Sequence, residues 1–180
     1  MSFDTALAFT LKEEGGYSDN PSDHGGATMH GITQRTYDDY RANLGLPSAP
    51  VLGISDDDVS TIYRGEYWDA VRGDSLPEPL DIVCFDSAVN SGGPHAAKWL
   101  QRAVNVSIDG DIGPQTLAAV AQCDVTNTCA IVLNLREEFD REDAQNNPSQ
   151  RKFLNDWLGR IGRLRDVVRQ YRGNTDPASN

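Results

Sequence analysis

The residue best placed to do chemistry is Glu14, in the stretch KEEGGYSDNPSDHGGATMHGIT that covers residues 12–33. Hydrolysis of a glycosidic bond needs a carboxylic acid that keeps its proton near neutral pH, usually with a second carboxylate nearby. Glu14 continues the helical stripe of Leu7 and Leu11, so partial burial disfavours its charged form, as does the end of a helix dipole. The position indicates a proton donor, although a solvated residue in a last helical turn has the same spacing.

The second carboxylate is left open between Asp19 and Asp23. Asp23 comes just before HGG, where paired glycines let a backbone approach a substrate closely. Either aspartate can instead bond to its own backbone in an Asx turn, which is the commoner use of Asp beside Gly. Further along, Thr28 could orient a water molecule and His30 could hydrogen-bond a sugar, although a lone loop histidine is more often an ordinary surface residue.

Around this loop the chain is mainly helical. Gly and Pro separate segments with apolar residues at helical spacing, and residues 17–33 have room for at most a short β-hairpin. In the first part of the chain, helices are expected up to residue 14, over 33–44, and from Ser55 toward Trp68. In the second part, helices are expected within 80–93, from Pro94, from Pro114 and over 126–145. A final amphipathic helix is expected to end near Tyr171. We therefore expect a mainly α fold with one irregular or hairpin loop near the N-terminus.

Length and charge limit the classes of protein to consider. The chain has 180 residues, enough for one well-packed domain, and a formal net charge of -11, which argues against a nucleic-acid partner. Residues 151–172 are basic, with a local balance of +5. This helix could make weak contact with an anionic outer membrane, but a solvated face over a buried stripe is the preferred interpretation.

The N-terminal residues do not resemble a secretory signal, and no apolar run is long enough to cross a bilayer. We therefore expect synthesis in the host cytoplasm and a separate route to any target outside it. The three cysteines (Cys84, Cys123, Cys129) and three histidines (His24, His30, His95) lack metal-ligand spacing, so we expect no metal and no cofactor. Cys84 is expected to be a buried thiol, while Cys123 and Cys129 could pair in an oxidising compartment.

Two blocks of sequence carry a family resemblance. EGGY at 14–17, followed by DNPSDHGGAT and HGIT, resembles the signature of the family 108 glycoside hydrolases, which are N-acetylmuramidases of phage and bacterial origin. FDSAVNSGGPHAAKWLQRAVNVSIDGDIGPQTLAAV, residues 85–120, is similar to their C-terminal region, described as predicted to bind peptidoglycan. The resemblance covers most of residues 5–172.

The resemblance implies a lysozyme-like domain over 1–172, with a catalytic-motif half at 1–80, a helical half at 81–172 and a tail at 173–180. It also implies an endolysin-type enzyme that cleaves peptidoglycan between N-acetylmuramic acid and N-acetylglucosamine in the wall after release. We expect the protein to be a monomer. The family's catalytic acid falls on Glu14. Asp23 fits the nine-residue spacing of phage-type lysozymes, whereas Thr28 is one residue early for their threonine.

The sugar contacts expected from this resemblance are Tyr17, stacking on a pyranose ring, with Asp86 and Asn90 donating and accepting hydrogen bonds. Gln101 is a weaker candidate. The alternative function is a noncatalytic wall-binding or scaffolding protein that keeps the same fold. Such a protein needs neither a proton donor at Glu14 nor an open glycine-rich loop beside it.

Overall fold

The computed structural model describes residues 1–18 and 26–175, with side chains through Tyr171. The chain divides into two compact units. One is Leu7–Glu66, and the other joins Met1–Ala6 to Tyr67–Asn180. Along the chain, one unit ends at Glu66 and the other resumes at Tyr67.

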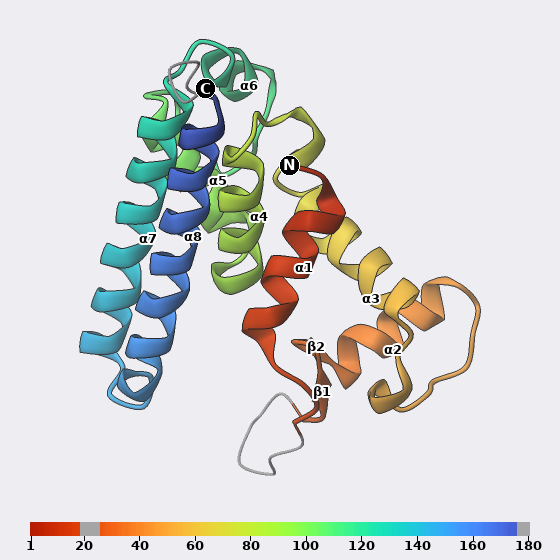
Figure 1. Cartoon of the computed structure of the whole chain (residues 1–180). Helices are drawn as coiled ribbons and strands as arrows, with labels where there is room; N and C mark the ends of the chain where they lie inside the picture. Colours follow the sequence, from red (N-terminus) through yellow and green to blue (C-terminus); the bar gives the residue numbers. More distant parts are fainter. Residues whose placement is uncertain (19–25, 176–180) are drawn as a thin grey trace. The chain divides into compact units, whose positions relative to one another are not determined.

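The unit Leu7–Glu66 holds the chemistry-bearing loop. Its elements are the end of α1 (Phe3–Glu14), β1 (Thr28–Met29), β2 (Ile32–Thr33), α2 (Gln34–Asn43), a 3-10 turn (Val51–Gly53) and α3 (Asp56–Tyr63), which continues into a π-helical turn (Arg64–Trp68) (Figure 1). The two strands pair antiparallel, with Thr28 opposite Thr33 and Met29 opposite Ile32. This is the short hairpin that the sequence predicts.

Helix starts in this unit follow from side-chain caps. The hydroxyl of Thr33 accepts the Thr36 N–H at 3.1 Å at the start of α2. Ser55 does the same for the Asp58 N–H at 3.1 Å at the start of α3, whose first turn carries three aspartates. Caps of this kind satisfy backbone donors that a helix leaves unpaired at its N-terminus.

Polar side chains tie the long connection of this unit to α2. The Gln34 amide donates to the Ala49 carbonyl and accepts the Val51 N–H, both at 2.8 Å. The carboxylate of Asp58 on α3 accepts hydrogen bonds from Tyr40 at 2.9 Å and Tyr37 at 3.3 Å on α2. These bonds fix α2 and α3 together beside the hairpin.

The second unit is built from helices packed around α4. Its elements are α4 (Leu80–Ser91), α5 (Gly93–Ala103), α6 (Pro114–Val120), α7 (Val125–Asn146) and α8 (Leu154–Thr175), with 3-10 turns at Gly73–Ser75 and Arg151–Phe153. In Figure 1, α7 and α8 run side by side along this unit. The mainly α fold with a small hairpin is therefore confirmed. Helix α8 continues to Thr175, the last residue that the structure describes.

The core of the second unit centres on α4, where every residue from Leu80 to Ala88 is buried. A helix that is buried all round must be enclosed by other elements. Phe3, Trp68 and Phe85 form an edge-to-face trio with ring centroids 5.4–5.9 Å apart. Gly73 lies against the Trp68 ring so closely that a methyl group there would be 2.3 Å from a ring carbon.

Part of the basic charge of residues 151–172 is paired with acidic side chains within the second unit. Arg160 bonds to Asp86, while Arg165 bonds to Glu137 at 2.8 Å. Farther along α8, Arg169 pairs with Asp166 at 2.6 Å. Two of the basic residues of this segment, Arg160 and Arg165, therefore have acidic partners outside it.

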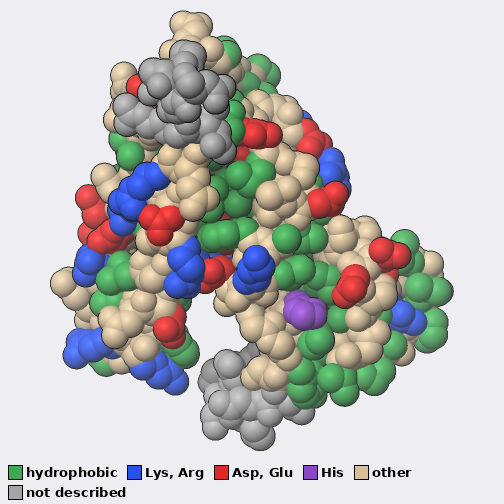
Figure 2. Space-filling view, in the orientation of Figure 1, with side chains coloured by type: hydrophobic (Ala, Val, Ile, Leu, Met, Phe, Trp, Pro, Cys, Tyr) green, Lys and Arg blue, Asp and Glu red, His purple; other side chains and the backbone are tan. Residues whose placement is uncertain are grey.

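Basic and acidic side chains are interspersed over the face formed by α7 and α8 (Figure 2). Within the described residues, no helix is both long and apolar enough to span a membrane.

Candidate active site

Glu14 is the last residue of α1, as the sequence predicts. Gly15 follows with φ +69°, a left-handed conformation that ends helices and that glycine adopts without a steric penalty. The Glu14 side chain is half-buried, while Gly15, Gly16 and Tyr17 are exposed. The carboxyl group thus stands at an open helix end, partly shielded from water.

The turn of the hairpin lies directly against this carboxyl group. His30 and Gly31 connect β1 to β2 with φ +51° and +75°. Two consecutive residues with positive φ make the tight two-residue turn that matches the twist of paired strands. A methyl group on Gly31 would lie 2.8 Å from Oε2 of Glu14, inside any normal contact distance. The backbone conformation favours glycine here, and any larger residue would also have to displace the Glu14 carboxyl group.

Tyr63, at the end of α3, completes the cluster. Its side chain is 1% exposed, and its hydroxyl donates to the His30 carbonyl at 2.7 Å. The same hydroxyl oxygen lies 3.0 Å from the point where a Gly31 methyl group would sit. Glu14, the His30–Gly31 turn and Tyr63 therefore meet at one place, although they come from α1, the hairpin and α3.

The loop that follows Glu14 is closed at its base by backbone hydrogen bonds. The Ser18 N–H donates to the Thr28 carbonyl at 2.9 Å, and the Thr28 N–H donates to the Ser18 carbonyl at 2.8 Å. These bonds hold Thr28 beside the loop entry, and they place the exposed Tyr17 next to it, 45% accessible. Asp19 and Asp23, the candidates for the second carboxylate, lie outside the described residues.

His30 contributes its backbone carbonyl to the cluster. The residue is half-buried, yet its ring Nδ1 is buried and has no hydrogen-bond partner among the described residues. A buried ring nitrogen of this kind needs a donor or acceptor to satisfy it. The contact with a sugar that the sequence suggests for His30 stays a prediction.

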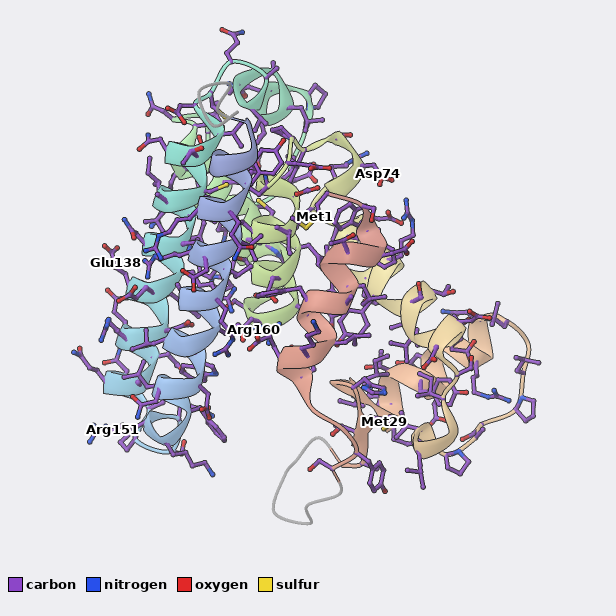
Figure 3. The ribbon with its side chains drawn as sticks, in the orientation of Figure 1. Met1, Met29, Asp74, Glu138, Arg151 and Arg160 are labelled. Carbon is purple, nitrogen blue, oxygen red and sulfur yellow. The ribbon has the colours of Figure 1, made fainter. Side chains whose placement is uncertain are left out.

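Asp86 lies at the centre of a buried ionic cluster in the second unit. Its carboxylate accepts from Arg160 of α8 at 2.7 Å and from Arg136 of α7 at 2.8 Å, and both Asp86 and Arg136 are 0% exposed. Arg160 is labelled in Figure 3. Burial alone would raise the pKa of Asp86, but the two guanidinium groups outweigh it and hold that pKa below its usual value. The sugar contact expected of Asp86 is thus not available, because both oxygens are enclosed and bonded inside the protein.

One helical turn after Arg136, Asp140 is buried without equivalent bonding. Its Oδ2 has no hydrogen-bond partner in the described part of the chain, and neither have Nε and Nη2 of Arg136. Burial raises the pKa of Asp140 to about 6, against the opposing effect of Arg136. This group therefore ionises near neutral pH inside the second unit.

Gln101 is likewise enclosed, at 1% exposure. Its amide nitrogen donates to Asp109 at 2.6 Å and to the Asp111 carbonyl at 2.9 Å, and its oxygen accepts the Gly110 N–H at 2.9 Å. Gln101 therefore stabilises the turn formed by DGDIG, residues 109–113, instead of facing a sugar. Asn90, by contrast, is half-buried near the end of α4, with its amide 3.3 Å from the Ser91 hydroxyl.

The cysteines are all free thiols. Cys84 is buried, as the sequence predicts, and so is Cys129, while Cys123 is half-buried. Within the described residues, no group of three His, Cys, Asp or Glu side chains is arranged to hold a metal ion.

Comparison with known proteins places this geometry in a family. Residues 7–92 match the family model described as Glycosyl hydrolase 108, and residues 95–162 match one described as Predicted Peptidoglycan domain. The solved structure of SagA from Brucella abortus shares 31% sequence identity over 98% of this chain and 97% of that chain, with a TM-score of 0.80. The chain belongs to the glycosyl hydrolase 108 family. No curated protein sequence matches it.

Membership of the glycosyl hydrolase 108 family makes the protein a glycoside hydrolase with a lysozyme-like function on peptidoglycan. The resemblance carried by EGGY, HGIT and residues 85–120 is confirmed. The family match over 7–92 spans the whole cluster of Glu14, Gly31 and Tyr63. The peptidoglycan match begins at residue 95, near the start of α5.

Sequence reasoning missed Gly31 and Tyr63 as members of this cluster. Gly31 reads as an ordinary turn residue, and Tyr63 reads as one apolar position of α3. HGIT was available as a signal for Gly31, because a glycine in a two-residue turn marks a hairpin. For Tyr63 the hydroxyl bond to a backbone carbonyl 33 residues earlier leaves no mark in the sequence.

Proposed function

We propose that this glycosyl hydrolase 108 protein is an N-acetylmuramidase. It hydrolyses the β-1,4 bond between N-acetylmuramic acid and N-acetylglucosamine in peptidoglycan, with Glu14 as the general acid. The observation that carries the proposal is the Glu14 carboxyl group, half-buried at the end of α1 and lying against the Gly31 turn. A half-buried carboxyl group at the end of a helix suits proton donation to a leaving sugar oxygen.

The remaining groups of the reaction are assigned by position. Asp23 is the proposed second carboxylate, with Asp19 as the alternative, and Thr28 is the candidate for orienting water. Tyr17, exposed at the mouth of the loop, offers an aromatic face to a sugar ring. Asp23→Asn and Asp19→Asn distinguish the two aspartates, because the true second group is the one whose amide variant loses turnover.

Product analysis tests the bond that is cleaved. Purified sacculi are digested, the soluble fragments are reduced with borohydride, and their ends are identified by mass spectrometry. The proposal predicts reduced N-acetylmuramic acid ends. Reduced N-acetylglucosamine ends, anhydro ends or free peptides would instead identify a glucosaminidase, a transglycosylase or an amidase.

The same digestion tests the noncatalytic alternative. A wall-binding protein would sediment with sacculi and release no fragments, whereas the muramidase releases fragments in proportion to time. The wider proposal, a phage-type endolysin that acts on the wall after release from the cytoplasm, is tested by producing the protein in cells whose membrane is then permeabilised. Rapid loss of turbidity with wild type, and none with Glu14→Gln, is the expected result.

The stereochemistry of the product tests the role of the second carboxylate. Carboxyl groups about 6.5–9.5 Å apart leave room for water and give inversion, whereas groups about 5–5.5 Å apart give retention. Proton NMR of the first anomer released from a soluble glycan chain reads this outcome directly.

A further inference from the structure

Tyr63 stands out among the buried tyrosines because its hydroxyl bonds to the turn that faces the acid. The bond joins the end of α3 to the His30 carbonyl at 2.7 Å, a normal distance for a strong hydroxyl donor. The Tyr63 ring is 1% exposed, so a sugar in solution cannot touch it. Any effect of Tyr63 on the reaction must therefore pass through other residues of the cluster.

We propose that Tyr63 is a positioning residue for Glu14: its hydroxyl holds the His30–Gly31 turn in the place where the turn's backbone confines the acid's carboxyl group. The inference rests on the proposed role of Glu14 as general acid. Both Oε2 of Glu14 and the Tyr63 hydroxyl lie within 3.0 Å of the point where a Gly31 side chain would begin. The three groups thus share one small volume, and a shift of the turn changes the space left for the carboxyl group.

The direction of the Tyr63 bond determines where its hydroxyl proton goes. A tyrosine hydroxyl has one proton, and here that proton is donated to a carbonyl. Toward a neighbouring carboxyl group, the phenol oxygen can then act only as an acceptor. The hydroxyl proton is thus committed to the turn, and the bond that it makes to the His30 carbonyl is the direct link between α3 and the hairpin.

The turn needs such an anchor because its backbone is unusual. His30 has φ +51°, a conformation that non-glycine residues seldom adopt without support from neighbouring contacts. The two-strand sheet on either side is only two residue pairs long. The Tyr63 hydroxyl is therefore a principal fixed point for the turn from outside the hairpin.

Tyr63→Phe removes the hydroxyl and leaves the ring. Turnover is measured on soluble, uncross-linked glycan chains, and kcat is separated from KM. We expect kcat to fall roughly ten- to a hundredfold, the scale of a misplaced catalytic group, while KM stays within about twofold because the ring does not reach the sugar. A residue that merely supports the fold would lower the melting temperature and leave the kcat of the folded fraction unchanged.

Tyr37→Phe is the matched control. Tyr37 is buried in the same unit, at 3% exposure, and its hydroxyl bonds to Asp58 at 3.3 Å, but it does not adjoin Glu14 in the contacts around Gly31. We expect it to lower stability with kcat unchanged. Equal kcat values for Tyr63→Phe, Tyr37→Phe and wild type would overturn the proposal.

Glu14→Gln measured alongside separates this proposal from the proposed function. An inactive Glu14→Gln with a fully active Tyr63→Phe rejects the positioning role and leaves the acid in place. An active Glu14→Gln rejects the proposed function itself. If Tyr63→Phe does not fold, the proposal is tested by Gly31→Ala, whose methyl group meets the same two oxygens at the exposed turn. Normal kcat in Gly31→Ala would contradict it, because the place of the turn against Glu14 would then have no catalytic consequence.

Discussion

Oε2 of Glu14 lies 2.8 Å from the point where a methyl group would project from Gly31. The acid at the end of α1 and the turn of the hairpin are therefore fitted to each other, although 17 positions separate them in the sequence. This fit gives the hairpin a specific role in the proposed reaction. It fixes one side of the space in which the carboxyl group sits.

Gly31→Ala should reduce activity by more than its effect on stability explains. The backbone penalty for a left-handed alanine is roughly 1–2 kcal/mol, and the added methyl group must also displace the Glu14 carboxyl. Gly45→Ala carries the same kind of backbone penalty at φ +71°, with nothing within 4 Å of the new methyl group. We expect similar losses of unfolding free energy in both variants, with kcat reduced about tenfold or more only in Gly31→Ala. Equal kcat values in the two variants would show that the contact with Glu14 has no catalytic consequence.

Asp86→Asn should destabilise the protein strongly. The substitution leaves Arg136 and Arg160 buried without their shared carboxylate, and breaking a buried pair in this way costs about 3–5 kcal/mol. Chemical denaturation of the variant measures this loss. Asp166→Asn, which breaks the exposed pair with Arg169, should change stability by less than about 0.5 kcal/mol. A loss of similar size in both variants would contradict the account of the buried cluster.

Asp140 should make stability depend on pH between about 4 and 6. Its ordinary pKa of 3.8 is raised by burial to about 6, so the folded state binds more protons than the unfolded state in that window. Stability due to this group is therefore present at low pH and lost as pH rises through 6. Asp140→Asn removes this effect. The free energy of unfolding of the variant, minus that of wild type, should therefore be more positive at pH 7.5 than at pH 4.5.

Urea denaturation of wild type and Asp140→Asn at both pH values checks this sign. Gln145→Ala, an exposed change on the same helix, is the control and should give the same difference from wild type at both pH values. If the difference in unfolding free energy between Asp140→Asn and wild type does not change with pH, folding does not raise the pKa of Asp140.

Thiol labelling should distinguish the three cysteines. Burial raises the pKa of Cys84 well above its ordinary value and raises that of Cys129 to about 12, so neither forms a thiolate readily at neutral pH. Cys123 is half-buried and should react first with a thiol reagent in the native protein. Peptide mapping after brief labelling should find the modification at Cys123, with Cys84 and Cys129 reacting after unfolding. Rapid native labelling of Cys84 would contradict the packing around α4.

Much of the fold could be predicted because its signals are local. The end of α1 at Glu14, the cap at Ser55 and the helix opened by Pro114 all follow from residue types at fixed spacings. The fate of Asp86 could not be predicted in this way. A polar residue four positions from Asn90 suggests a shared solvent face, and only the packing of α4 against α7 and α8 shows that its partners are arginines 50 and 74 positions away.

The residues of the candidate site also fall into those that local sequence identifies and those that only the fold brings together. Glu14 is identified by its helical stripe and by its glycine-rich surroundings, which are neighbours in the sequence. Tyr63 and Gly31 belong to the site because three elements converge, and no periodicity in the sequence reports that convergence. For Gln101 the sequence prediction was misleading. A polar residue in a helix suggested a contact with a ligand, whereas its amide group hydrogen-bonds to the turn at 109–111.

The rate of Glu14→Gln on purified peptidoglycan tests the central claim most directly, with Glu13→Gln, the half-buried neighbour, as its control. Glutamine keeps the shape of the side chain and cannot supply a proton, and general acid help is worth about a hundred- to ten-thousandfold. We predict a loss of that size in Glu14→Gln with the melting temperature unchanged or slightly raised, and a near-normal rate in Glu13→Gln. A Glu14→Gln protein that releases muropeptides at the wild-type rate would contradict the account.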